Sequence, residues 1–212
     1  PNGAGKTTIF NMLTGVYKPT DGKICLDGED ITGKSTMEIN KEGIARTFQN
    51  IRLFSDLTVL DNVKAGLHNQ KEYIYSTLSG ILRLPSYHKA EKAMDERAME
   101  LLKVFDLEKE SDYKASNLPY GKQRKLEIAR ALATNPKLLL LDEPFSALDS
   151  QTRLSVSDDI GKILRQEKKT AILVTHDISE AISMADRVII LSPRPAIIRK
   201  IVPVCFDLEN RT

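Results

Sequence analysis

The sequence predicts an α/β fold, in which a mostly parallel sheet forms the core of a phosphate-binding domain and a helical subdomain is inserted into that core. Three observations lead to this prediction. The chain opens with a glycine-rich phosphate-binding loop, Pro1–Thr8. Continuous apolar runs such as Leu138–Leu141 are typical of parallel strands that are covered on both faces. Between about residues 59 and 133, by contrast, the hydrophobic pattern is almost entirely helical.

Length and composition limit the alternatives. The 212 residues suit one domain, which we divide into an α/β core (residues 1–58 and 134–212) and a helical subdomain (about 59–133). The 31 basic and 29 acidic side chains leave a net charge of +2, which is too weak to indicate a nucleic-acid partner. Cys25 and Cys205 lack metal-ligand spacing, so free thiols in a reducing compartment are expected. No apolar run reaches the ~18 residues that span a bilayer, so a membrane role would depend on partner subunits.

The opening loop suits a chain of phosphates. It fits G-x-x-x-x-G-K-[ST] apart from the first glycine, which would precede Pro1, so we expect a further strand upstream. Gly3 and Gly5 allow a tight bend that points backbone N–H groups at one anion. Lys6 supplies a charge for the β and γ phosphates, and the Thr7 hydroxyl can ligate Mg²⁺. The alternative is a chance glycine-rich turn, which the apolar helix pattern that follows disfavours. The residues expected to bind the nucleotide here are Asn2, Gly3, Ala4, Gly5, Lys6, Thr7 and Thr8.

The next segments indicate short elements that end at Gln49. Residues 23–28 alternate in polarity and end in Asp-Gly, which predicts a strand and a tight turn. Residues 36–43 are polar and suit a short helix, and residues 44–49 suit a strand. On local sequence alone, Gln49 is most simply an exposed loop residue.

The central block is predicted to be helical. Thr58 suits an N-cap, and residues 70–86 offer a broad apolar face before a proline. Apolar side chains follow one helical stripe over residues 88–105. The segment Leu118–Lys122 then opens a helix that runs to about Ala133.

Two carboxylates follow the buried strand at residues 138–141. Because ligands of α/β sheets bind at the carboxyl ends of strands, Asp142 is placed to hold Mg²⁺ and Glu143 to polarise an attacking water. A solvated acidic turn is the alternative. A second buried strand, residues 170–175, delivers His176 to the same edge of the sheet, which favours a functional over a structural histidine.

The rest of the chain completes the α/β pattern. Asp149 or Ser150 is expected to cap a helix over about residues 151–167. The remaining predicted elements are a helix at residues 177–185 and strands at 187–191 and 196–201, which flank the turn Ser192–Pro195.

The ordered motifs resemble those of the nucleotide-binding subunit of an ABC (ATP-binding cassette) transporter over essentially the whole chain, which would make the core a P-loop NTPase. The resemblance implies that Asp142 is the Walker B carboxylate beside the Walker A P-loop. It further implies that Glu143 is the catalytic base, that His176 is the switch histidine and that Gln49 is the glutamine that contacts both the metal and the membrane subunit. The motifs are the P-loop, Gln49, Leu118–Gln123, Leu138–Glu143, Ser146–Asp149 and His176.

The same resemblance implies ligands and partners. ATP and Mg²⁺ would be the ligands, with Thr7, Gln49 and Asp142 on the metal. A second ATPase subunit, identical or paralogous, would dimerise head to tail with this one. Membrane permease subunits would be the other direct partners and a solute-binding protein an indirect one, with no nucleic acid. The protein would sit peripherally at the cytoplasmic face of the inner or plasma membrane.

The signature loop departs from the family's usual form, L-S-G-G-Q, because only Leu118 and Gly121 match it. Pro119 lacks the hydroxyl and N–H that would reach the partner's ATP, and Lys122 places a positive charge near it. A proline-tyrosine form is similar to that of branched-chain amino acid importers. The resemblance implies that the nucleotide of the partner subunit is contacted by Leu118, Pro119, Tyr120, Gly121, Lys122 and Asp149.

Two importer subfamilies are resembled by different parts of the chain. Residues 44–62 and 73–127 look like the ATPases of branched-chain amino acid uptake systems, whereas residues 145–149, 174–177 and 191–195 look like those of nitrate, sulfonate or taurine importers. The helical subdomain, which faces the membrane subunit in this family, favours an ATP-hydrolysing subunit that energises branched-chain amino acid import. The alternatives are the second importer type, a soluble ABC ATPase acting on DNA or ribosomes, and a partner that binds ATP without hydrolysing it.

Overall fold

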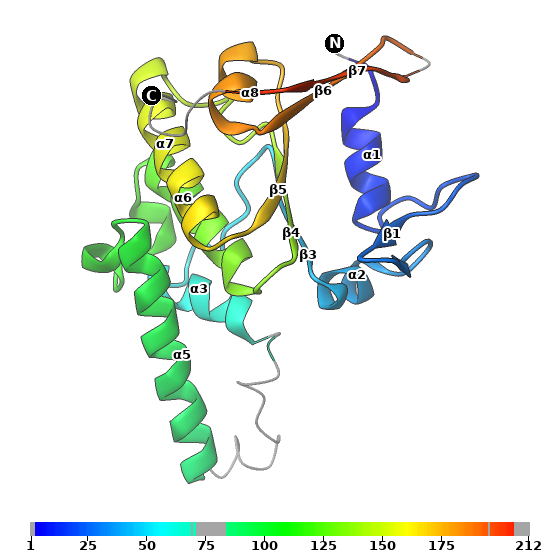
Figure 1. Ribbon diagram of the computed structural model, residues 1–212. Helices are drawn as coiled ribbons and strands as arrows, with labels where there is room; N and C mark the ends of the chain where they lie inside the picture. Colours follow the sequence, from blue (N-terminus) through cyan, green and yellow to red (C-terminus); the bar gives the residue numbers. More distant parts are fainter. Residues whose placement is uncertain (1–2, 69, 71–83, 195, 206–212) are drawn as a thin grey trace.

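The computed structural model describes residues 3–68, 70, 84–194 and 196–205 (Figure 1). Asn2, which was expected in the nucleotide site, lies outside these residues, as does most of the apolar segment expected before Pro85.

A three-stranded parallel sheet forms the centre of the core. Strand β4 (Leu138–Asp142) lies between β3 (Ile44–Thr47) and β5 (Thr170–Val174), with both pairs parallel. Side chains of a strand point alternately to its two faces. Leu139 and Leu141 accordingly pack into a large cluster with the helices of one face, while Leu140 joins a smaller cluster on the other. The predicted α/β class with a parallel core sheet is confirmed.

Helices cover both faces of this sheet. Figure 1 shows α6 (Tyr120–Ala133) and α7 (Ser150–Gln166) on one side, and α1 (Lys6–Leu13) and α2 (Thr36–Glu42) on the other. The Ser35 hydroxyl and the Glu38 carboxylate cap the start of α2 reciprocally, which explains why this polar stretch is helical.

The elements that the structure describes between β3 and β4 are α-helices and 3₁₀ turns. Helix α3 (Val59–Leu67) packs on α5 (Pro85–Val104) and on α6. The Thr58 hydroxyl accepts a hydrogen bond from the Asp61 amide and caps α3. Helix α5 begins at Pro85, three residues before the predicted start, because proline is tolerated in a first turn. Two short 3₁₀ turns, η2 (Glu108–Glu110) and η3 (Ala115–Asn117), lead to α6.

Two antiparallel pairs flank the parallel sheet. Strands β1 (Cys25–Leu26) and β2 (Glu29–Asp30) form a short hairpin, so the first predicted strand is shorter than expected. Helix α8 (Ile178–Met184) precedes β6 (Arg187–Leu191) and β7 (Ile198–Pro203), which pair with each other and not with β5. None of the helices described here is long and apolar enough to cross a membrane.

Candidate active site

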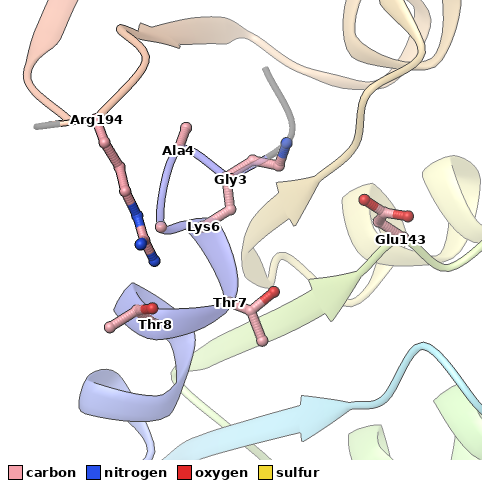
Figure 2. Close-up of a pocket in the computed structure, with 8 residues that line it drawn as sticks. Gly3, Ala4, Lys6, Thr7, Thr8, Glu143 and Arg194 are labelled. Carbon is pink, nitrogen blue, oxygen red and sulfur yellow. The ribbon is translucent and has the colours of Figure 1, made fainter.

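The P-loop lines a cavity of about 280 Å³, which we call the P-loop cavity. Gly3 and Gly5 adopt positive φ angles of 77° and 84°, a conformation that glycine takes at little cost, and α1 starts at Lys6 immediately afterwards. Backbone N–H groups at a helix N-terminus favour anions. Figure 2 shows the Thr7 hydroxyl pointing toward the end of β4 that carries Glu143. The residues that line this cavity are Gly3, Ala4, Gly5, Lys6, Thr7, Thr8, Glu143 and Arg194.

Glu143 is held in an unusual backbone conformation directly after β4. Its φ angle of 43° is left-handed, which for a residue other than glycine costs roughly 1–3 kcal/mol. The Glu143 amide donates a 2.8 Å hydrogen bond to the Val174 carbonyl on β5, which fixes the turn in place. Glu143 lines the P-loop cavity together with the loop itself (Figure 2).

Three predicted catalytic residues meet at this carboxylate. Gln49 Nε2 donates a hydrogen bond to Glu143 Oε2 at 3.4 Å, and His176 Nδ1 lies 3.5 Å from the same oxygen. The His176 side chain is 59% exposed and that of Glu143 19%, so the pair is open to solvent on one side. The His176 backbone is anchored by its neighbours, because the Asp177 amide donates to the Thr175 hydroxyl, which donates to Glu180.

Asp142 is buried beside the cavity and paired with an arginine. Arg46 Nη2 donates to Asp142 Oδ2 at 2.6 Å, and both side chains are 8% exposed. Arg46 Nη1 donates to Asn11 Oδ1 at 2.7 Å, which ties the carboxylate to the P-loop helix α1. The Phe10 and Phe48 rings contact the guanidinium with centroids at 5.5 Å and 5.1 Å.

The signature loop forms part of a second cavity, of about 530 Å³, which we call the signature groove. Its lining includes Pro119–Lys122 and Asp149, so the structure brings these predicted residues together, away from the P-loop cavity. Leu118 is buried and does not line the groove. Gly121 packs so closely on α7 that an added Cβ would lie 2.8 Å from Thr152 Cγ2.

The charged residues of the signature groove are paired within the chain. Lys122 Nζ forms an ion pair with Glu110 on η2. Asp149 Oδ1 accepts a 3.0 Å hydrogen bond from the Thr152 amide and caps α7, as predicted. Hydrogen bonds from the Thr152 side chain and then from its amide lower the pKa of the Asp149 carboxyl below its ordinary value.

Sequence reasoning missed several residues that shape the site. Arg46 stood in a predicted strand, where a charged residue signals a buried partner, but nothing local named that partner as Asp142. The sequence placed Arg194 only in the turn Ser192–Pro195. Its side chain reaches the P-loop cavity because the turn between β6 and β7 lies beside the P-loop in the fold (Figure 2). Arg124 is fully buried in α6, although its neighbours in sequence are polar.

Comparison with known proteins identifies a matching family and several relatives of this chain. The chain matches the ABC transporter family over residues 1–146. It is 38% identical to the high-affinity branched-chain amino acid transport ATP-binding protein BraF of Pseudomonas aeruginosa over 192 residues, which cover 91% of this chain and 74% of that protein. The corresponding protein LivG of Escherichia coli K12 gives the same identity and coverage.

A solved structure agrees at the level of the fold. The dimeric ATP-binding cassette MJ0796, in a post-hydrolysis state bound to ADP and Pi, superposes with a TM-score of 0.73 at 30% identity, covering 98% of this chain and 84% of that one. The resemblance stated from the motifs, including that to branched-chain amino acid uptake ATPases, is confirmed. The chain therefore belongs to the ABC transporter family, and its fold is that of the family's ATP-binding cassettes.

Proposed function

We propose that the chain is the ATP-hydrolysing subunit of an ABC importer and that it energises the uptake of branched-chain amino acids. The observation that carries the hydrolytic part is the meeting of Glu143, His176 and Gln49 at the rim of the cavity that the P-loop lines. The substrate rests on two relatives, BraF and LivG, whose names give branched-chain amino acid transport and which match 91% of the chain.

The P-loop cavity suits the phosphates of ATP. The N-terminus of α1 and the backbone of Gly3–Gly5 offer N–H donors, and Lys6 and Arg194 add two cationic side chains to the lining. Among the described residues, the guanidinium of Arg194 has no carboxylate partner within ion-pair distance, as expected of a group that faces an anionic ligand.

The oxygen-bearing groups near this cavity also suit Mg²⁺, which prefers hard oxygen ligands. We propose that the Thr7 hydroxyl, the Asp142 carboxylate and the Gln49 amide oxygen hold the ion. The fit rests on Asp142, whose Oδ2 is fixed by Arg46 while the carboxylate stays beside Glu143 at the end of β4. When bound, the ion neutralises charge on the transferring phosphoryl group.

Glu143 is the proposed general base. Its carboxylate can accept a proton from a water that lies between it and the P-loop cavity, in line with the γ phosphate. Gln49 and His176 converge on the same oxygen and would keep the carboxylate and the water oriented. Because the three side chains come from the ends of β3, β4 and β5, the parallel sheet itself sets their spacing.

The separation of the two cavities supports a head-to-tail dimer. We propose that the signature groove of one subunit covers the P-loop cavity of the other, so that each ATP is bound by both chains. The related cassette MJ0796, solved as a dimer with ADP and Pi, supports this arrangement. The helical subdomain, about residues 59–133, is then the part proposed to contact membrane permease subunits, with the ATPase peripheral at the cytoplasmic face.

The full-length protein reconstituted with its permease in proteoliposomes tests this proposal. ATP turnover should rise when a binding protein loaded with leucine, isoleucine or valine is added, and a Lys6→Ala variant should show no such rise. Stimulation by nitrate or taurine instead would overturn the proposal that branched-chain amino acids are the transported substrates. No turnover above the Lys6→Ala background, with assembly verified, would overturn the hydrolytic role.

A further inference from the structure

A buried ion pair on α6 faces the segment that carries Gln49. Arg124 and Glu127 lie three residues apart on one side of the helix, with side chains 0% and 2% exposed. Residues three apart in a helix share a face, so both can reach the same neighbour. That neighbour is the segment of residues 48–52, which follows β3 and runs beside α6 toward α3 (Figure 1).

The pair binds the main chain of this segment at three points. Arg124 Nη1 donates to the Phe48 carbonyl at 2.7 Å, and Arg124 Nη2 donates to the Gln49 carbonyl at 2.8 Å. The Arg52 amide donates to Glu127 Oε1 at 3.1 Å. Arg124 Nη1 also donates to Glu127 Oε2 at 2.6 Å, so the two side chains hold each other. We call this arrangement of Arg124 and Glu127 the α6 clamp.

The chemistry of the α6 clamp is specific to arginine. The planar guanidinium presents a fixed fork of donors, which here spans two consecutive carbonyl groups while a third contact is kept to the carboxylate. An ammonium group is a point charge on a flexible stem and cannot present the same fork. Stability alone does not account for such a pair, because apolar residues of similar volume often replace a buried ion pair at no cost.

The α6 clamp lies between the two cavities. At one end, Gln49 reaches Glu143 through its side chain at 3.4 Å. At the other end, α6 begins at Tyr120 in the signature groove, one turn before Arg124. Arg124 and Glu127 therefore connect the main chain around Gln49 to α6, and the first residues of α6 line the signature groove.

We propose that Arg124 is a positioning residue for hydrolysis: with Glu127 it fixes the main chain of Gln49 to α6, so that a shift of the signature-groove helix moves Gln49 relative to Glu143. This inference rests on the proposed ATPase function. When the nucleotide held by the partner subunit binds in the signature groove, the movement of α6 would shift Gln49 and so change the surroundings of Glu143 in the same subunit. The moving element is one helix carrying one loop segment, a rigid-body change of the kind that couples sites in other switches.

The test uses the full-length protein and removes both charges at once. In the variant Arg124→Met/Glu127→Leu no uncompensated buried charge remains, so the fold is expected to persist. The kcat for ATP should fall about tenfold, because a small displacement of an orienting group is costly for an aligned reaction. ATP affinity, set mainly at the P-loop, should stay within about twofold. Arg124→Lys, which keeps the charge without the fork, should show the same loss of kcat.

A mutant cycle with Gln49 separates positioning from general stability. If Arg124 and Glu127 act through Gln49, the double substitution changes kcat by less than about twofold in a Gln49→Ala background. Lys64→Met/Glu91→Leu/Asp95→Asn is the matched control, because it removes the ion pairs of Lys64 with Glu91 and Asp95 between α3 and α5, which lie outside residues 48–52, and leaves none of the three charges unpaired. An equal loss of kcat with and without Gln49, or an unchanged kcat in the variant, would overturn the inference.

Amide hydrogen exchange tests the α6 clamp independently of turnover. The Arg52 amide, which donates to Glu127, should exchange at least about tenfold faster in the double variant than in the wild type. Failure of the ATPase proposal would appear as a wild type without turnover, whereas failure of this inference would appear as unchanged Arg52 exchange or as a cycle without coupling.

Discussion

The two cavities of this cassette are built in opposite ways. The P-loop cavity collects its functional side chains from segments far apart in the chain, and there Glu143, Gln49 and His176 face one another. The signature groove is formed at the starts of α6 and α7, and its charged groups are already paired within the chain, Lys122 with Glu110 and Asp149 with the Thr152 amide. The P-loop cavity therefore combines backbone N–H groups with side chains brought together from distant segments, whereas the signature groove depends mainly on the close packing of two helix starts.

The largest effect on stability is expected beside the P-loop cavity. Removing one partner of a buried ion pair leaves the other charge unpaired, so Arg46→Met should lower the free energy of unfolding by about 3–5 kcal/mol. Chemical denaturation measures this. Lys92→Met, which removes an exposed pair with Glu96 at 3.9 Å, is the control and should cost less than about 1 kcal/mol. A similarly small loss of unfolding free energy for Arg46→Met would mean that Arg46 does not hold Asp142 as described.

Shape should dominate in the signature groove. Gly121→Ala places a Cβ 2.8 Å from Thr152 Cγ2, and the overpacking should lower the free energy of unfolding by about 1–3 kcal/mol. Thr152→Ser removes that methyl group and should rescue the variant.

Gly161 provides the contrast for this prediction. In α7 an added Cβ at Gly161 would meet nothing closer than 3.5 Å, so Gly161→Ala should stabilise by about 0.5–1 kcal/mol through helix propensity. Thermal unfolding of Gly121→Ala, Gly121→Ala/Thr152→Ser and Gly161→Ala measures these effects. If Gly121→Ala is as benign as Gly161→Ala, close packing does not explain the glycine.

The sequence predicts the helices and strands better than it predicts the contacts between residues that are far apart in the chain. Apolar runs located β3, β4 and β5, and the caps Thr58 and Asp149 were recognisable because each side chain accepts from an amide only three residues away. Contacts between distant segments were not visible. The pairing of Arg46 with Asp142, 96 residues later, exists only because β3 and β4 are neighbours in the sheet.

The same limit applies to the site. Glycines, a lysine and carboxylates at fixed spacing were enough to predict the P-loop, Asp142 and Glu143 as site residues, because these patterns are local in the sequence. Lys122 was expected to place a positive charge near the partner's nucleotide, and its ion pair with Glu110 could not be foreseen because η2 returns to the start of α6 only in the folded chain. The positive φ of Glu143 was equally hidden, since it follows from the hydrogen bond to β5.

The smallest expected effect is a pH dependence in the signature groove. The pKa of Asp149 is lowered in the folded chain, relative to an ordinary value of 3.8, by hydrogen bonds from the Thr152 side chain and amide. A carboxyl group with a depressed folded pKa contributes stability above its unfolded pKa and loses that contribution as the pH falls through the folded pKa. The contribution should therefore be complete above about pH 5 and disappear toward pH 3 and below.

The matched variant for this effect is Asp149→Asn. Asparagine caps helices as well as aspartate but does not titrate, so the difference in unfolding free energy between the two proteins should change only in the acidic window. Denaturation at a series of pH values from neutral to acid measures it. A difference that is independent of pH would show that the Asp149 charge contributes nothing to the α7 cap.

The most direct measurement of the central claim is ATP turnover by Glu143→Gln in the full-length subunit assembled with its permease. Glutamine preserves the size of the side chain but cannot accept the proton, so hydrolysis should fall by about 10²–10⁴-fold. ATP binding, measured by nucleotide retention on the same assembly, should persist because the P-loop is intact. Undiminished turnover in this variant would contradict the assignment of Glu143 as the base at the P-loop cavity.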